Sequence, residues 1–522
     1  MAIILIHVSH YTGFDKIPKH WTSIREIVMK YGGIIRQEMT HELKVSRKSG
    51  AKFSLTTDKW TSVRNRRYIN INLHKLGGTC WNLGLVRASG SLPAETILEN
   101  LERKLAEFQL DLSLDIAAIT TDGARVMEKL GRLITPEQQL CLAHGIQLAV
   151  LDTFYKKSNE NETEGDISDE GCDSDDSQGD QNFTMDQSHQ NEAAGFCHSS
   201  LDPVIDKVKR VVKKCTGSPK LNDLVQKYVK QDLGHELTLK KESKTRWSSL
   251  LTMLESILKL KSSLQKVWID TSFSDWGVIL SEIDFNTVDM LVKALTPVKN
   301  TVEAICNRDA TLLTADTAIN FMLKVLESQK NKIAEDLVDA LTARLQYRRS
   351  DNSSVLQYLH TGNLDYNDMC PAFRSMFTQP RQATIIEVVK RFNRNHGHDF
   401  DDENLTDRDG EISEIDTDKD LKTQLYEAIK TANTSSYGPS KAKNDPRSLS
   451  GIIKKEISLF ETTGNRGILL KNTYDALLTI QPTSVESERA FSSAGYLCSK
   501  IRSRMSDNTL DTLCFLRHFF KK

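Results

Sequence analysis

The sequence lacks three features that mark special classes of protein. No window approaches the roughly 20 consecutive apolar residues of a membrane-spanning helix, so we expect no membrane as a partner. The N-terminus has neither the basic lead nor the length of a secretory signal. The nine cysteines are scattered singly, without the paired spacing of a disulfide framework, which is typical of a reducing compartment. The remaining class is a globular protein, and 522 residues are enough for about three domains.

Net charge is also nearly absent, at -1, but this value hides a segregation of the charged residues. Residues 158–206 contain many acids and no Lys or Arg, whereas residues 207–246 are rich in Lys. The acidic segment therefore masks the basic character of its neighbour. For this reason the net charge neither indicates nor excludes a nucleic acid as partner.

Hydrophobic periodicity predicts a helix followed by a sheet in the first part of the chain. Residues 17–48 repeat apolar side chains every three or four positions, as a helix does. From Phe53 the period changes to two, and residues 68–74 alternate strictly, as a half-buried strand should. The predicted strands are 53–62, 68–74, 79–86, 116–122 and 139–143, and the predicted helices among them are 93–109, 124–130 and 144–155. A meander followed by crossovers predicts one mixed sheet with helices on its faces.

The rest of the chain alternates between polar and helical segments. Residues 158–200 are acidic and rich in Ser, Asn and Gln, so they have too few apolar groups to bury a core and should be disordered. Residues 201–390 have helical spacing almost throughout. A second acidic stretch, 399–420, is predicted to be a linker or loop, and residues 509–520 form an apolar amphipathic helix.

Three acids stand in contexts suited to metal binding. Asp58 lies in the first predicted strand, Asp122 ends the fourth, and Glu488 lies in a predicted helix. Carboxylates from two strand ends and a helix can hold a pair of hard divalent cations, and such a pair serves phosphodiester chemistry. Each acid also has an ordinary interpretation: Asp58 as a turn carboxylate, Asp122 as the N-cap of the next helix, and Glu488 in a solvated ion pair.

Two further motifs carry His, Lys and aromatic side chains. Cys141 and His144 have the spacing of half a zinc site, but a structural zinc needs four ligands. The other candidates are Cys172, Cys197 and His198 of the disordered segment, so we prefer a packed Cys141 with His144 facing the catalytic crevice.

The second motif is a basic segment that ends in Trp247. Its cations can contact phosphates while the indole stacks on an unpaired base. Equally, the segment can be an ordinary helix start whose tryptophan covers the core. The candidate DNA-binding residues here are Lys240, Lys241, Lys244, Arg246 and Trp247.

Five segments, in their order along the chain, resemble motifs of the hAT superfamily of DNA transposases. They are residues 56–62 (TTDKWTS), 120–124 (TTDGA), 141–144 (CLAH), 245–247 (TRW) and 487–495 (SERAFSSAG). The tail from residue 500 onward resembles the family's C-terminal dimerisation region. The resemblance runs from about residue 50 to the end of the chain.

This resemblance implies a fold, a chemistry and a set of partners. The fold would be α/β plus all-α, a ribonuclease-H-like mixed sheet interrupted by a large helical insertion domain, with the first and fourth strands as neighbours. The implied parts are an N-terminal helical segment (1–50), the first part of the catalytic core (51–157), the acidic insert (158–200), the insertion domain (201–470) and the last part of the core with the dimerisation region (471–522).

In that family scheme Asp58, Asp122 and Glu488 bind two Mg²⁺ or Mn²⁺ ions for DNA strand cleavage and transfer. Trp247 would stabilise a flipped base, and His144 would lie near the DNA. The implied partners are DNA and a second copy of the chain, in the nucleus, with no small-molecule substrate.

The chain departs from the family pattern in two informative places. No Cys/His array of the BED zinc-finger type precedes Asp58, and Gly123 stands where relatives commonly have Asn. Gly leaves the carboxylate of Asp122 in place but removes a hydrogen-bond partner. These departures favour an alternative, a domesticated non-catalytic nuclear protein that dimerises and binds DNA or chromatin. A ribonuclease for RNA–DNA hybrids ranks last, because it leaves the helical insertion domain and the Arg246–Trp247 motif unexplained.

Overall fold

The computed structural model describes residues 20–62, 65–90, 92–154, 201–242, 247–271, 276–362, 369–393, 448–497 and 505–520. The segments predicted to be disordered or to form a linker, 158–200 and 399–420, lie outside these residues, as do Lys244 and Arg246. The chain divides into two compact units, one made of Met1–Pro380 with Tyr474–Lys522 and the other of Arg381–Thr473. The domain boundaries implied by the resemblance stay a prediction.

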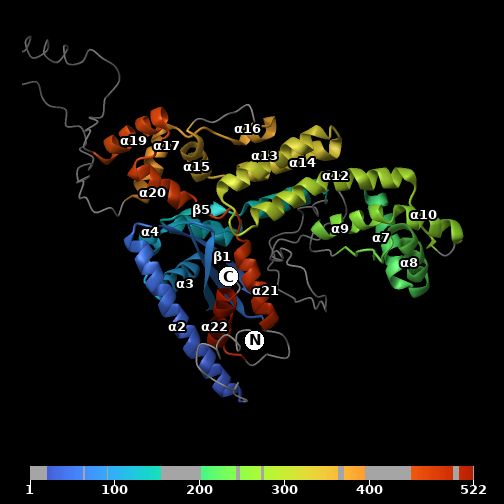
Figure 1. Ribbon diagram of the computed structural model, residues 1–522, viewed down its shortest axis with the longest axis horizontal. Coiled ribbons are helices and arrows are strands. Elements are labelled where there is room, and N and C mark those ends of the chain that lie inside the picture. Colours follow the sequence, from blue (N-terminus) through green and yellow to red (C-terminus); the bar gives the residue numbers. More distant parts are fainter. Residues whose placement is uncertain are drawn as a thin grey trace, which may run out of the picture. The chain divides into compact units, whose positions relative to one another are not determined.

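The first unit contains a five-stranded mixed sheet (Figure 1). Its strands are β1 (Phe53–Thr61), β2 (Arg67–Lys75), β3 (Thr79–Ala88), β4 (Ile116–Thr121) and β5 (Glu137–Leu140). The spatial order is β3-β2-β1-β4-β5, in which β1, β2 and β3 form an antiparallel meander and β4 and β5 run parallel to β1. The predicted mixed sheet and the predicted neighbourhood of the first and fourth strands are confirmed.

The two faces of the sheet differ in chemistry because the side chains alternate along each strand. One face carries apolar residues such as Leu55, Ile69 and Ile71, which share a buried cluster with residues of α3 (Ala94–Ala106) and α5 (Arg125–Leu133). The opposite face carries polar residues, listed by strand as Ser54, Thr56 and Asp58 in β1, Asn70, Asn72 and His74 in β2, and Asn82 in β3.

The prediction that β2 is half-buried was wrong, because its polar side chains are as buried as its apolar ones. Two C-terminal helices, α21 (Val485–Leu497) and α22 (Asp507–Phe519), cover them. The Nδ2 of Asn72 donates to the Oγ of Ser487 in α21 at 3.2 Å, and the hydroxyl of Tyr68 donates to Asp507 in α22 at 2.7 Å.

The last helix, α22, is a core element of the first unit. Its residues 509–516 are all buried, and it packs against α2 (Trp21–Lys48) and β3. Asp511 accepts hydrogen bonds from the Nη2 of Arg36 at 2.7 Å and from the backbone N–H of Leu85 at 2.7 Å, and it lies 3.4 Å from the Nζ of Lys104. The N-terminal helix predicted over 17–48 is confirmed as α2, and its contact with α22 joins the two ends of the chain.

Helices make up the region after the sheet, as predicted for 201–390. Beside the sheet lie α4 (Leu112–Asp115) and α6 (Leu142–Phe154). The helices of the following region are α7 (Asp202–Gly217), α8 (Pro219–Leu233), α9 (Trp247–Lys259), α10 (Lys261–Asp270), α12 (Glu282–Ile305), α13 (Leu312–Ser328), α14 (Lys332–Gln346), α15 (Asp351–Thr361) and α16 (Pro371–Met376). Their apolar stripes form a second large core. Among the described residues, no helix combines the length and hydropathy that a bilayer crossing requires.

The second unit is small and helical. It contains α17 (Gln382–Phe392), α19 (Leu449–Thr463) and the first part of α20 (Ile468–Leu477). The Nδ2 of Asn393, at the end of α17, donates to the Oγ1 of Thr473 in α20 at 3.1 Å, and both residues are buried.

Candidate active site

The two candidate aspartates belong to neighbouring parts of the sheet, Asp58 within β1 and Asp122 directly after β4. Thr56 of β1 pairs with Thr120 of β4 in parallel register, and each threonine stands two residues before its aspartate. The backbone N–H of Lys59 donates to the Oδ1 of Asp58 at 2.7 Å, and that of Ala124 donates to the Oδ1 of Asp122 at 3.2 Å. The N-cap of α5 is Ala124, without a side-chain bond, so Asp122 orders the turn before the helix rather than capping it.

Glu488 belongs to α21, the helix that covers the polar face of the sheet. The indole of Trp60 in β1 stacks on Phe491 of α21, with ring centroids 5.8 Å apart. The exposed fractions of Asp58, Asp122 and Glu488 are 6, 9 and 8%. The interpretation of Glu488 as part of a solvated ion pair is therefore wrong, since the residue is buried and its neighbour Arg489 pairs with Glu486.

The segment leading into α21 is hydrogen-bonded to the ends of β4 and β5. The hydroxyl of Thr120 donates to the carbonyl of Gln481 at 2.7 Å, and the N–H of Leu142 donates to the carbonyl of Pro482 at 2.9 Å. The N–H of Ser484 lies 3.5 Å from the Sγ of Cys141. Burial, with a smaller contribution from the charge of Glu488, raises the pKa of Cys141. Glu488 is thus close enough for its charge to act on Cys141, which follows β5.

The three acids face the same side of the sheet, but they do not form a closed ligand group. Within the described ranges, which include all three acids, no three His, Cys, Asp or Glu side chains are arranged to hold a metal ion. Asp58 lies in β1, Asp122 directly follows the neighbouring β4, and Glu488 lies on α21, which packs on β1 and β2.

A buried arginine lies against the turn after Asp122. Arg348, which follows α14, donates from Nη1 to the carbonyl of Cys141 at 3.2 Å. A Cβ on Gly123 would lie 2.6 Å from its Nη2, and a Cβ on Gly145 would lie 2.6 Å from its Cδ. Burial lowers the pKa of Arg348, although the charge of Asp122 acts in the opposite direction. The space left by two glycines is filled by one arginine, and no local pattern in the sequence points to this residue.

The remaining predicted site residues have clear places. His144 and Cys141 are buried at the start of α6, and the other zinc candidates lie outside the described residues. Trp247 begins α9 and is 7% exposed in the helical core, as the packing alternative expects. Lys240 and Lys241 are exposed just before it. A role of these residues in binding DNA stays a prediction.

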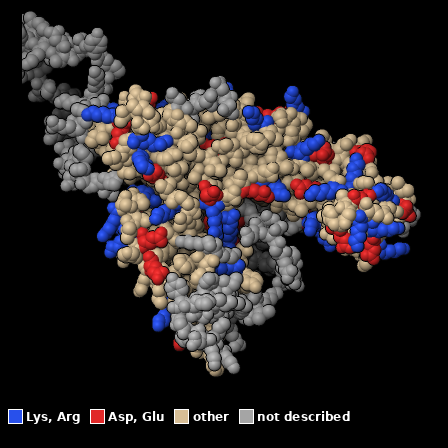
Figure 2. Space-filling view, viewed as in Figure 1, with Lys and Arg blue, Asp and Glu red and all other residues tan. Residues whose placement is uncertain are grey.

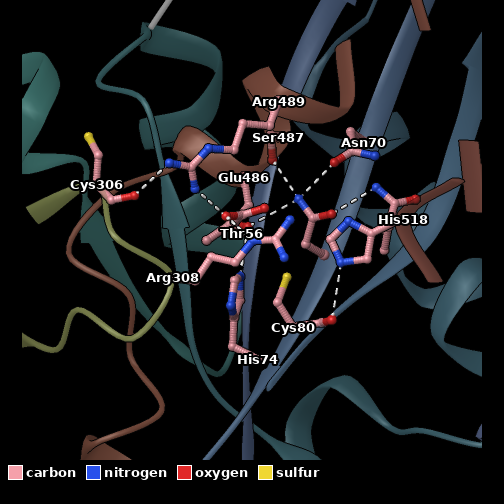
Figure 3. Close-up of polar contacts among 12 residues, drawn as sticks. Thr56, Asn70, His74, Cys80, Cys306, Arg308, Glu486, Ser487, Arg489 and His518 are labelled. Carbon is pink, nitrogen blue, oxygen red and sulfur yellow. Dashed lines mark hydrogen bonds and ion pairs between the residues drawn. The ribbon is translucent and has the colours of Figure 1, made fainter. Parts of the chain in front are cut away.

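A buried polar network on the sheet was also missed. The Oγ1 of Thr56 lies 2.9 Å from the Nε2 of His74, and the amides of Asn72, Asn70 and Asn82 continue the chain of hydrogen bonds (Figure 3). Burial lowers the pKa of His74 to about 4, despite the nearby charge of Glu486. The polar residues of the alternating pattern in 68–74 were the available signal, but the pattern does not tell solvent from a polar interior.

Comparison with known protein families matches two regions of the chain, one of which contains the helices that cover the sheet. Residues 462–520 match the hAT family C-terminal dimerisation region, and residues 195–294 match the ZBED1 RNase-like helical domain. The chain is a hAT transposase-like protein. No curated protein matches it.

In this hAT transposase-like protein the dimerisation region includes α21 and α22. The region indicates self-association. Residues 509–516 of α22 are buried within one chain. At the surface of the region lies Tyr496, whose exposed ring is 5.6 Å from the guanidinium of Arg517.

Proposed function

We propose that this chain cleaves DNA strands and transfers them, with Asp58, Asp122 and Glu488 holding Mg²⁺ or Mn²⁺. One observation carries the proposal. Buried Asp58 of β1 and buried Asp122, which directly follows β4, each stand two residues beyond the paired threonines of these adjacent parallel strands, and a buried glutamate lies on the helix that packs on β1. Oxygen ligands of this kind suit hard divalent cations.

The chemistry divides between the metal and the protein. A bound metal pair would activate the attacking oxygen and stabilise the leaving oxygen. The protein orients its carboxylates, since the N–H groups of Lys59 and Ala124 each hold one carboxylate oxygen of an aspartate. Because the described residues contain no closed group of three ligands, the proposal requires Glu488 to turn toward the aspartates when metal and DNA bind.

The proposed partners and location follow from the substrate. DNA would be the ligand, a second copy of the chain would be the protein partner, and the nucleus would be the site of action. Exposed Lys240 and Lys241 lie within the segment that matches the RNase-like helical domain, where they are available to phosphates. Acidic and basic side chains are mixed over the face in Figure 2, so local clusters rather than overall charge would recognise DNA.

A second function is supported by the same open arrangement of ligands. A protein that binds DNA and self-associates without cutting would keep the polar core and the dimerisation region, and it would not need a closed metal site.

The experiment is a calorimetric titration of the full chain with MnCl₂, beside nicking of supercoiled plasmid DNA in the same buffer. Asp122→Asn is the test variant, because an amide oxygen can still accept from Ala124. Asp289→Asn is the matched control, since Asp289 is a carboxylate outside the site that pairs with Lys293 along α12, at 2.6 Å. We expect saturable heat and nicking in the wild type and the control, and loss of both in Asp122→Asn.

Equal heats in the wild type and Asp122→Asn would exclude Asp122 as a ligand. If the wild type gave neither heat nor nicking but still bound duplex DNA, the second function would replace the first.

A further inference from the structure

One buried carboxylate on α21 holds two arginines from distant parts of the chain. The Oε1 of Glu486 accepts from the Nε of Arg308 at 3.3 Å and from the Nη1 of Arg489 (Figure 3). Arg308 lies in the turn between α12 and α13, and Arg489 lies one helical turn after Glu486. The three side chains therefore join the helical region to the helix that covers the sheet.

The charges of this cluster do not cancel. Two guanidinium groups face one carboxylate, which leaves a surplus of one positive charge. The side chain of Glu486 is 4% exposed, whereas those of Arg308 and Arg489 are 41 and 39% exposed. Since the anion is inside and the cations reach the surface, the surplus faces the solvent.

A second contact fixes the direction of the Arg489 guanidinium, whereas that of Arg308 is held by Glu486. The Nη2 of Arg489 donates to the carbonyl of Cys306 at 2.9 Å. Arg308 uses only its Nε in the described structure, so its two terminal amino groups remain available. Its neighbour Asp309 lies against Gly78 in the β2–β3 turn, and among the described residues no ion pair joins Asp309 to Arg308.

The cluster lies beside the candidate catalytic glutamate. Arg489 directly follows Glu488 in the sequence. Burial raises the pKa of the Cys306 thiol, the charge of Glu488 also raises it, and the charge of Arg489 lowers it. A ligand held by the two arginines would therefore lie next to the acidic site and not on a remote surface.

We propose that Arg308 and Arg489 bind one backbone phosphate of DNA, with Glu486 holding the pair in place. The inference rests on DNA as the partner in the proposed function. A guanidinium presents parallel donors that match the oxygens of a phosphate, and a side chain held by a buried partner loses little conformational freedom on binding. The site needs both the helical region and α21, so it forms only when these two parts are packed together.

The competing explanation is an ion pair that serves stability alone. Salt dependence separates the two, because each neutralised phosphate contributes about 0.9 to the slope of log affinity against log salt for duplex DNA. In Arg308→Gln the remaining Arg489 and Glu486 are a neutral pair, so the surplus charge is gone. Arg308→Lys keeps the surplus but loses the guanidinium fork.

The measurement is fluorescence anisotropy of a labelled 30-base-pair duplex with the full chain, in about 50–200 mM NaCl. We expect a slope shallower by about 0.9 for Arg308→Gln, and an unchanged slope with weaker binding for Arg308→Lys. Arg344→Gln is the matched control, because Arg344 is also 39% exposed and pairs with one carboxylate, that of Asp152, without a surplus. Its slope should equal that of the wild type.

A wild-type slope in Arg308→Gln, with a lower melting temperature, would overturn the phosphate site and leave the ion pair as a structural contact. This result would not touch the proposed function, which is judged by metal heats and nicking. If the wild type and the control both failed to bind the duplex, DNA would be rejected as the partner and the phosphate site with it.

Discussion

Replacing Gly123 with alanine would place a Cβ 2.6 Å from Nη2 and 3.1 Å from Nη1 of Arg348. The guanidinium cannot easily move away, because Nη1 donates to the carbonyl of Cys141 and Gly145 confines the Cδ on its other side. Inserting a methyl group into such a packed site costs about 1–3 kcal/mol. The φ of Gly123 is not in the left-handed region, so alanine also restricts the unfolded chain, which stabilises by about 0.4–1 kcal/mol.

The expected net loss for Gly123→Ala is therefore about 1–2 kcal/mol. Thermal unfolding followed by circular dichroism measures it, and at about 2–4 °C for each kcal/mol in a domain of 150–250 residues the midpoint should fall by about 2–8 °C. Gly33→Ala is the control, because Gly33 has open space around its Cα on α2 and alanine favours a helix by about 0.5–1 kcal/mol.

A double-mutant cycle tests the cause of the loss. In an Arg348→Ala background the added methyl group meets no guanidinium, so Gly123→Ala should cost less than about 0.5 kcal/mol there. The same cost in both backgrounds would refute the pairing of Gly123 with Arg348. The pairing accounts for the Gly at position 123, since a larger side chain there would require the arginine to move.

Two further predictions concern buried charged groups. The pKa of His74 is lowered to about 4 by burial, so the unfolded chain takes up its proton first on acidification. The free energy of unfolding should fall by up to about 3 kcal/mol between pH 6.5 and 4; equal pH slopes in the wild type and His74→Gln would contradict this. Asp511→Ala removes the buried carboxylate shared by Arg36, Lys104 and the backbone N–H of Leu85, and Lys104 then keeps only its ion pair with half-exposed Glu107 among the described residues. The loss should be about 3–5 kcal/mol in thermal unfolding. Asp289→Ala, at an exposed pair, should cost less than about 0.5 kcal/mol, and equal losses would disprove the role of Asp511.

Much of the secondary structure and part of the site followed from local pattern. Residues 17–48 and 93–109 have helical spacing and form α2 and α3, and residues 68–74 alternate and form β2. Asp58 and Asp122 were identified from their strand contexts, and the pairing of β1 with β4 confirms that their strands are neighbours. Glu488 was identified from its motif, and its position on α21 follows from the fold.

The error over the polar face of β2 shows the limit of local pattern. A strand that alternates apolar and polar residues has the same sequence whether its polar face meets water or a polar interior. Asn72 is buried because α21 covers that face of the sheet. This helix carries Ser487, which lies 415 residues further along the chain and accepts a hydrogen bond from Asn72. In the same way Arg348 reaches Gly123 and Cys141 across the fold, and no spacing in the sequence links them.

The sequence by itself determined the strands, the helices and the hAT motifs, and it named the three candidate acids, because periodicity and motif are properties of neighbouring residues. Only the tertiary structure decided which polar residues are buried, which arginines surround Glu486, and that α22 belongs to the core of its own chain. The physical reason is that burial and charge pairing depend on distance in space, and the covering helices arrive from the far end of the chain.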